Sequence, residues 1–264
     1  MGFLNKNNKI EFFHPDLNAA ENFPILDSRD FKLNWVKKAR ANFDKARGDG
    51  RTENPGFTNI TRCPGIFDLL KEGYVVRSHK DLMIFPREDG FKFILPDDQQ
   101  GNWFIDRPYE GTPSPKINIM ANPEWEIPHP PNVYPYILKI ETGWNVITPK
   151  NVKLLIIPLP YPDDFNVSQT SGILDPSHST QINFQGYVYK TDSKLILKAG
   201  TPLLMIIPLT EKKYEMTQRL ANEKDRMWIA KDYTMVGTHF WPVDYRQLTR
   251  KMYERFWIKR KQDV

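Results

Sequence analysis

The β core is indicated most clearly by a short apolar stretch that occurs twice, as Leu154-Leu155-Ile156-Ile157-Pro158-Leu159 and as Leu204-Met205-Ile206-Ile207-Pro208-Leu209. Four consecutive apolar residues followed by proline are typical of a buried strand, because proline has no N–H group to extend the hydrogen-bond ladder. The repeat therefore predicts two equivalent buried strands, each ending at its proline.

Other stretches around this repeat are rich in β-branched and aromatic residues and are bounded by Gly, Pro and Asp, which is the pattern of short strands. Including the repeat, the predicted strands cover residues 74–77, 82–85, 91–95, 133–140, 144–147, 152–157, 182–189, 195–197 and 203–207. Many short strands at this spacing favour a barrel or a sandwich. We therefore predict an α+β fold: a central, mostly antiparallel β-barrel or sandwich, for which a β-clip-like arrangement is one form, with an N-terminal helix and C-terminal helices.

The 264 residues are predicted to form a single domain, because no linker divides them. A helical N-terminal part covers residues 27–73, a β core covers 74–209, and a basic helical part covers 211–264. The predicted helices span residues 30–47, capped by Asp27 or Ser28, a short stretch from Pro64, and residues 212–225 and 245–261. Residues 1–26 are polar and are predicted to be irregular.

The segment 107–135 carries eight of the chain's 22 prolines. Few central strands tolerate that density, so we expect an extended segment that wraps a surface or meets a neighbouring subunit. The chain would then form a homo-oligomer.

The charge and the cysteine content limit the classes of protein to which the chain can belong. We predict a soluble, cytoplasmic protein without membrane contact. The chain has one cysteine, no apolar run that approaches the roughly 20 residues of a membrane span, and no secretory signal pattern. The net charge is +5, and residues 211–264 hold 13 basic residues against 8 acids. The last helix either makes weak polyanion contacts or is a solvated amphipathic helix.

One region resembles a known superfamily. Residues 140–209 resemble the core of the dCTP deaminases and trimeric dUTPases. The resemblance is carried by Gly172-Ile173-Leu174-Asp175-Pro176, by the following strand through Gln185, and by Ile196 to Leu203. The resemblance implies a distorted β-barrel and a homotrimer with sites between subunits. The rest of the chain looks like uncharacterised proteins of phages and marine bacteria.

The same resemblance assigns site residues. Asp175 matches the aspartate that activates water in dUTPases, whereas Gln185 stands where the deaminases have a glutamate and cannot shuttle a proton. Residues 158–161 replace the Arg-Ser phosphate motif of the superfamily. The ligand-binding candidates are therefore Asp175, His178 and Gln185, in a site that has lost most of its chemistry.

Metal and cofactor signals are sparse. The five histidines are isolated from one another in the sequence, but His79-x-Asp81 with a distant histidine such as His178 could form a two-histidine, one-carboxylate iron site. The alternative is a turn histidine beside an exposed aspartate. The acid pair Asp163-Asp164 lies in a proline-flanked turn and is expected to be solvated. No glycine-rich phosphate loop occurs, and no cofactor is expected.

These observations favour a non-catalytic binding or structural protein, encoded by a phage. The competing hypotheses are a divergent nucleotide hydrolase or deaminase-like enzyme that uses Asp175, and an iron oxygenase that uses His79 and Asp81.

Overall fold

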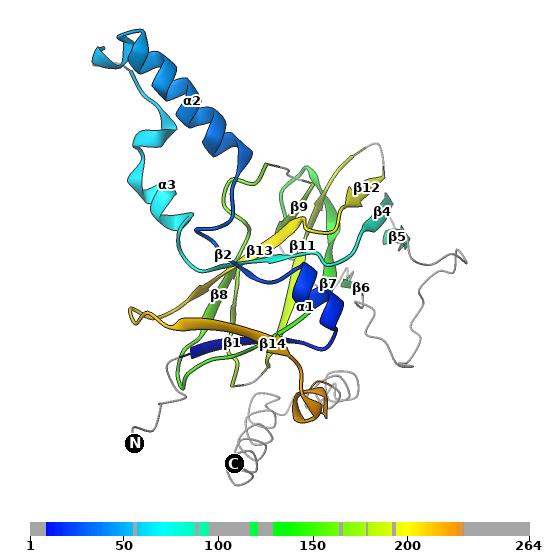
Figure 1. Cartoon of the computed structure of the whole chain (residues 1–264). Coiled ribbons are helices and arrows are strands. Elements are labelled where there is room, and N and C mark those ends of the chain that lie inside the picture. The colour runs from blue at the N-terminus through cyan, green and yellow to red at the C-terminus, as the bar shows by residue number, and fades with distance from the viewer. Residues whose placement is uncertain are drawn as a thin grey trace, which may run out of the picture.

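The computed structural model describes residues 9–54, 57–87, 90–94, 117–120, 129–163, 166–177, 179–191, 194–227 and 229. The predicted helix 245–261, most of the proline-rich segment and His178 lie outside these residues. The described part is an α+β structure in which strands predominate, as the sequence predicts, and its strands form three sheets (Figure 1).

The first sheet has six strands in the order β14-β1-β7-β11-β9, with β6 paired to β7. Strands β1 and β14 are parallel, and the other neighbours are antiparallel. The bounds are β1 Lys9–His14, β6 Ile117–Met120, β7 Val133–Ile147, β9 Val167–Gln169, β11 Gln181–Tyr189 and β14 Glu215–Leu220.

Two further sheets are antiparallel throughout. The second has the order β10-β8-β13-β3-β2 and the third the order β12-β4-β5, in which β4 and β5 are consecutive in the chain. The bounds are β2 Leu26–Asp27, β3 Tyr74–Arg77, β4 Leu82–Arg87, β5 Gly90–Ile94, β8 Leu154–Ile157, β10 Gly172–Leu174, β12 Leu195–Leu197 and β13 Pro202–Pro208.

The repeated apolar stretches become β8 and β13, which are neighbours in the second sheet. Leu154 and Leu204 are fully buried in the main core, which also receives side chains from both other sheets. Met205 points to the opposite face, where it is buried in a second cluster with Leu33. Burial on both faces explains why these strands are apolar at every position rather than at alternate ones.

The helices are short except for one. Helix α2 (Asn34–Gly48) projects from the sheets together with α3 (Pro64–Leu69) and the 3₁₀ turns η2 (Arg51–Glu53) and η3 (Ile60–Arg62) (Figure 1). We call the described residues 34–54 and 57–70 the arm. Helix α1 (Leu17–Asn22) follows β1 and is capped by Asp16, whose carboxylate accepts the Ala19 N–H.

Several predicted boundaries were wrong. The predicted helix over residues 212–225 is instead β14, because parallel pairing with β1 overrides the helix propensity of its Glu, Met, Gln and Arg residues. Residues 9–14 are not irregular, since β1 is held between β14 and β7. The separate strands predicted at 133–140 and 144–147 join into β7, where Gly143 supplies a backbone φ of +74°.

Helix α2 begins at Asn34 rather than near Asp30, and the predicted cap Asp27 lies in β2. The helix that starts at Pro64 is confirmed, and Gly73 after it has the positive φ that a glycine accommodates. No helix in the described part of the chain is long and apolar enough to cross a membrane.

Candidate functional site

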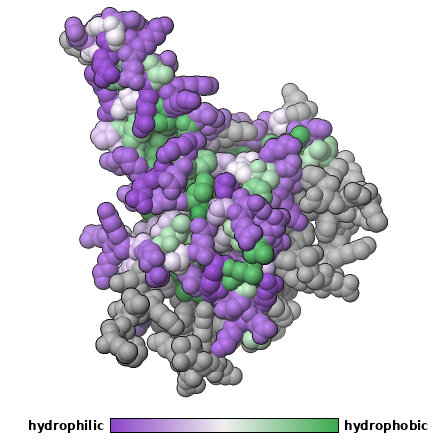
Figure 2. All heavy atoms as spheres, in the orientation of Figure 1, coloured by the Kyte–Doolittle hydropathy of each residue, from purple (hydrophilic) through white to green (hydrophobic). Residues whose placement is uncertain are grey.

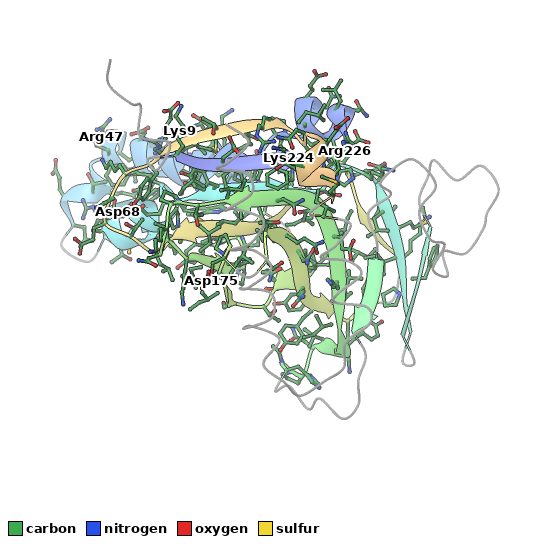
Figure 3. The ribbon with its side chains drawn as sticks, turned by 90° about the horizontal axis from the view of Figure 1, so that it is seen from below. Lys9, Arg47, Asp68, Asp175, Lys224 and Arg226 are labelled. Atoms are coloured by element: carbon green, nitrogen blue, oxygen red, sulfur yellow. The ribbon has the colours of Figure 1, made fainter. Side chains whose placement is uncertain are left out.

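Asp175 lies directly after β10 and is held within its own turn. Its Oδ1 accepts hydrogen bonds from the Ser177 N–H (3.0 Å) and hydroxyl (2.6 Å), and its Oδ2 lies 3.5 Å from Lys153 Nζ. In Figure 3 it lies on the opposite side of the sheets from Lys224 and Arg226. These contacts are those of an aspartate that closes a turn.

Gln185 lies on β11, in the first sheet, whereas Asp175 follows a strand of the second. The Gln185 N–H donates to Gln169 Oε1 (2.8 Å), and its carbonyl accepts from the Thr170 N–H and hydroxyl. Its side chain lies on the outer face of β11, because the alternate residues of this strand are buried in the core. The two described members of the predicted site thus belong to different sheets.

Asp81 does not face His79. Its Oδ2 lies 3.0 Å from Lys198 Nζ and its Oδ1 accepts the Ala199 N–H at 2.7 Å. The amide and then the lysine hold the pKa of this carboxyl below its usual range. Within the residues that the structure describes, no group of three or more His, Cys, Asp or Glu side chains could hold a metal ion.

His79 instead lies against His14, a residue that the sequence analysis did not connect with it. Their ring centroids are 5.3 Å apart, and the Trp144 ring is 5.0 Å from His14. His14 Nδ1 lies 3.0 Å from both the backbone nitrogen and the carbonyl oxygen of Asp16, and Nε2 lies 3.2 Å from the Thr142 carbonyl oxygen. We call His14, His79 and Trp144 the histidine cluster.

Burial dominates the electrostatics of the histidine cluster. Desolvation lowers the pKa of His14, and desolvation followed by repulsion from His14 lowers the pKa of His79 to about 4. Both imidazoles are therefore neutral near pH 7. Trp144 is 1% exposed, and its Nε1 has no hydrogen-bond partner among the described residues.

A pocket of about 610 Å³ lies where the arm leaves the sheets. It is lined by residues 31–34, 157–163, 166–169 and 201–203, with Tyr189 and Leu197. Leu33, Leu159 and Leu203 give it an apolar base. The polar Gln169 in its wall is occupied by the bonds to Gln185 and Thr170. The pocket therefore offers shape and apolar surface rather than reactive groups.

The loop at the edge of this pocket fastens the arm. The helix cap residue Leu33 supplies no side-chain hydrogen bond, and Asp163 takes that role: its two oxygens accept the Asn34 N–H (2.8 Å) and the Trp35 N–H (3.1 Å). Trp35 Nε1 donates to the Tyr161 carbonyl at 2.7 Å. Asp163 is exposed, as expected, but it caps a distant helix N-terminus, which a negative charge stabilises.

The arm packs on itself beyond this attachment. The Arg62 guanidinium lies over the rings of Phe43 (5.7 Å) and Phe57 (5.8 Å), and Arg40 lies over Phe67 (6.0 Å). These contacts hold one face of α2 against the chain that returns toward α3. Its opposite face remains uncovered by any described residue.

Helix α2 is strongly basic, and Lys37, Lys38 and Lys45 are exposed on its uncovered face. Helix α2 contains five basic residues and one acid: Lys37, Lys38, Arg40, Lys45, Arg47 and Asp44. Figure 2 shows hydrophilic residues over most of the visible surface of the arm, with hydrophobic residues gathered near its base. The sequence predicts this helix, but its charge excess lies in residues 211–264, so polyanion contact is predicted only for the last helix.

Comparison with models of protein families, with curated proteins and with solved structures finds no match for this chain. The fold and the site therefore define the class of protein: an α+β protein with three sheets in its described part, a histidine cluster that is largely buried and a projecting basic arm.

Proposed function

We propose that this chain is a non-catalytic binding protein whose recognition element is the arm. The observation that carries the proposal is α2, a 15-residue helix that projects from the sheets and is basic on its uncovered face. Ordering a segment of this length costs conformational entropy. We infer that contact between the projecting charged helix and a partner offsets this entropy cost.

The state of the candidate catalytic groups supports the non-catalytic part of the proposal. Asp175 is engaged by Ser177 and Lys153, and Asp81 by Lys198 and Ala199. A carboxylate that already accepts several hydrogen bonds in a turn is a poor general base, because those bonds favour its charged form. The amide of Gln185 cannot act as a general acid in the hydrolase or deaminase-like hypothesis.

For the architecture we propose a sandwich in which the first and second sheets face each other. It is supported by the main core, to which Phe12 and Phe184 of the first sheet and Leu154 and Ile206 of the second contribute side chains. Kinship with the dUTPase-like barrels, and the trimer that it implies, remains a proposal that rests on residues 140–209. Light scattering on the purified protein would measure the oligomeric state directly.

Turnover assays test the proposed absence of catalysis. We expect neither pyrophosphate from dUTP nor ammonia from dCTP when each is incubated with the purified chain and Mg²⁺. Release of either product that disappears in an Asp175→Asn variant would contradict the proposal and support the hydrolase.

Metal analysis tests the oxygenase. After anaerobic incubation with iron(II) and removal of free metal, we expect less than stoichiometric iron. Stoichiometric iron that is retained by the wild type and lost in a His79→Ala variant would overturn the proposal. A His129→Ala variant is the control, since His129 is exposed.

A further inference from the structure

The uncovered face of α2 carries three lysines that are available to a ligand. Lys37, Lys38 and Lys45 are exposed and form no ion pair with any described residue. The other cations of the arm have partners: Arg47 pairs with Asp44 (3.3 Å) and Arg51 with Asp49 (2.9 Å), while Arg40 and Arg62 lie over aromatic rings. No acid among the described residues therefore neutralises these lysines.

The helical geometry gathers these lysines on one face. Lys37 and Lys45 are eight residues apart, about 12 Å along the axis, and Lys45 also lies at i+7 from Lys38. The small exposed Ala41 and Gly48 lie between or next to the lysines on this face. The exposed acid Asp44, at i+7 from Lys37, borders this face and is paired with Arg47. We call Lys37, Lys38, Ala41, Lys45 and Gly48 the lysine face.

The composition of the lysine face favours a nucleic acid over a protein or a membrane as its partner. Protein interfaces are depleted of lysine and depend on aromatic and arginine anchors, which this face lacks. An amphipathic helix that lies in a membrane inserts an apolar face, but the apolar side of α2 is already covered, since Val36 packs against the cluster of Leu33 and Met205 and Phe43 lies under Arg62. Flexible point charges beside small residues suit the phosphate groups of a nucleic acid backbone.

We propose that the lysine face binds the phosphate backbone of a double-stranded nucleic acid without reading its sequence. The 12 Å between Lys37 and Lys45 corresponds to about three to four base-pair steps at roughly 3.4 Å each, so the three lysines can contact separate phosphates. The inference rests on the arm being the recognition element and names its partner.

Salt dependence of binding tests the proposal. The probe is a labelled 20-base-pair DNA duplex of arbitrary sequence, titrated with the full chain between 50 and 200 mM NaCl, and an RNA duplex of the same sequence shows which backbone binds better. In the Lys37→Gln, Lys38→Gln, Lys45→Gln variant, the loss of three phosphate contacts makes the negative slope of log K against log salt shallower by about 2.7. Over this fourfold salt range, wild-type binding should therefore weaken about 40-fold more than binding of the variant.

A matched variant distinguishes the effect of the lysine face on binding from the effect of the protein's net charge. Lys150, Lys190 and Lys212 are exposed lysines outside the arm, and replacing all three by Gln changes the net charge equally. We expect this control to retain the wild-type slope. Equal losses in both variants would overturn the proposal, as would a wild type that binds phosphatidylserine vesicles but neither duplex. That failure would leave the turnover results, and with them the non-catalytic function, unaffected.

Discussion

The histidine cluster predicts that the protein loses stability between pH 7.5 and pH 5.0. Burial lowers the pKa of His79 from an ordinary value of 6.5 to about 4. The unfolded chain therefore takes up a proton at a higher pH than the folded chain does. The stabilising contribution is fully present above about pH 6.5 and is lost as the pH falls toward the folded pKa.

The magnitude follows from these two pKa values. At pH 5.0 most unfolded chains carry a proton on His79 and most folded chains do not, so the free energy of unfolding falls by about 2 kcal/mol relative to pH 7.5. The pKa of His14 is also lowered, and its titration acts in the same direction. Most carboxyl groups remain ionised at pH 5.0, so they contribute little to the difference.

Urea unfolding followed by tryptophan fluorescence at both pH values measures this loss. A His79→Gln variant should lose about 2 kcal/mol less than the wild type between the two pH values, whatever its stability at pH 7.5. His129→Gln, which replaces an exposed histidine, should behave like the wild type. The reasoning is refuted if the wild type is equally stable at both pH values, or if His79→Gln retains the full loss.

Three further substitutions test the attachment of the arm, the backbone at the histidine cluster and the core. Asp163→Ala removes the cap of α2 and should destabilise the arm by about 1 kcal/mol, seen as faster tryptic cleavage within residues 37–51 than in the sheets. Gly143→Ala should cost roughly 2 kcal/mol or more in urea unfolding, because φ is +74° and the new Cβ would lie 2.2 Å from His14 Nε2. Leu204→Ala should cost about 2–5 kcal/mol by the same measurement, because a fully buried side chain leaves a cavity.

Each of these has a matched control. Asp68→Ala removes an exposed acid of the arm that pairs only at its surface with Lys71, and should not alter cleavage. Gly172→Ala adds a Cβ with nothing within 4 Å, and Ile173→Ala shortens a side chain that is 64% exposed. Both should change stability by less than about 0.5 kcal/mol. Effects as large as those of the test substitutions would contradict the structural reasons given.

The candidate site could be predicted only in part, because its groups are brought together by distant segments. His14 and His79 are 65 positions apart and meet only because β1 and the turn after β3 converge beside β7. The pattern His79-x-Asp81 suggested a shared face, but Asp81 turns to the Lys198–Thr201 turn. No local signal connects Asp163 with α2, since the two are about 130 positions apart in the chain.

The sequence by itself determined the elements that have strong local periodicity. The apolar repeat specified β8 and β13, the alternation in Gln181–Tyr189 specified β11, and the helical spacing of apolar residues in the predicted helix 30–47 specified α2 apart from its first residue. Tertiary structure decided β14, whose helix-forming residues become a strand because β1 supplies a partner for its backbone. It also decided where α2 begins, because its first free N–H groups are satisfied by Asp163 rather than by a neighbour in sequence. Local pattern fixes which face a residue prefers to bury, whereas backbone hydrogen bonds between distant segments fix which elements form and meet.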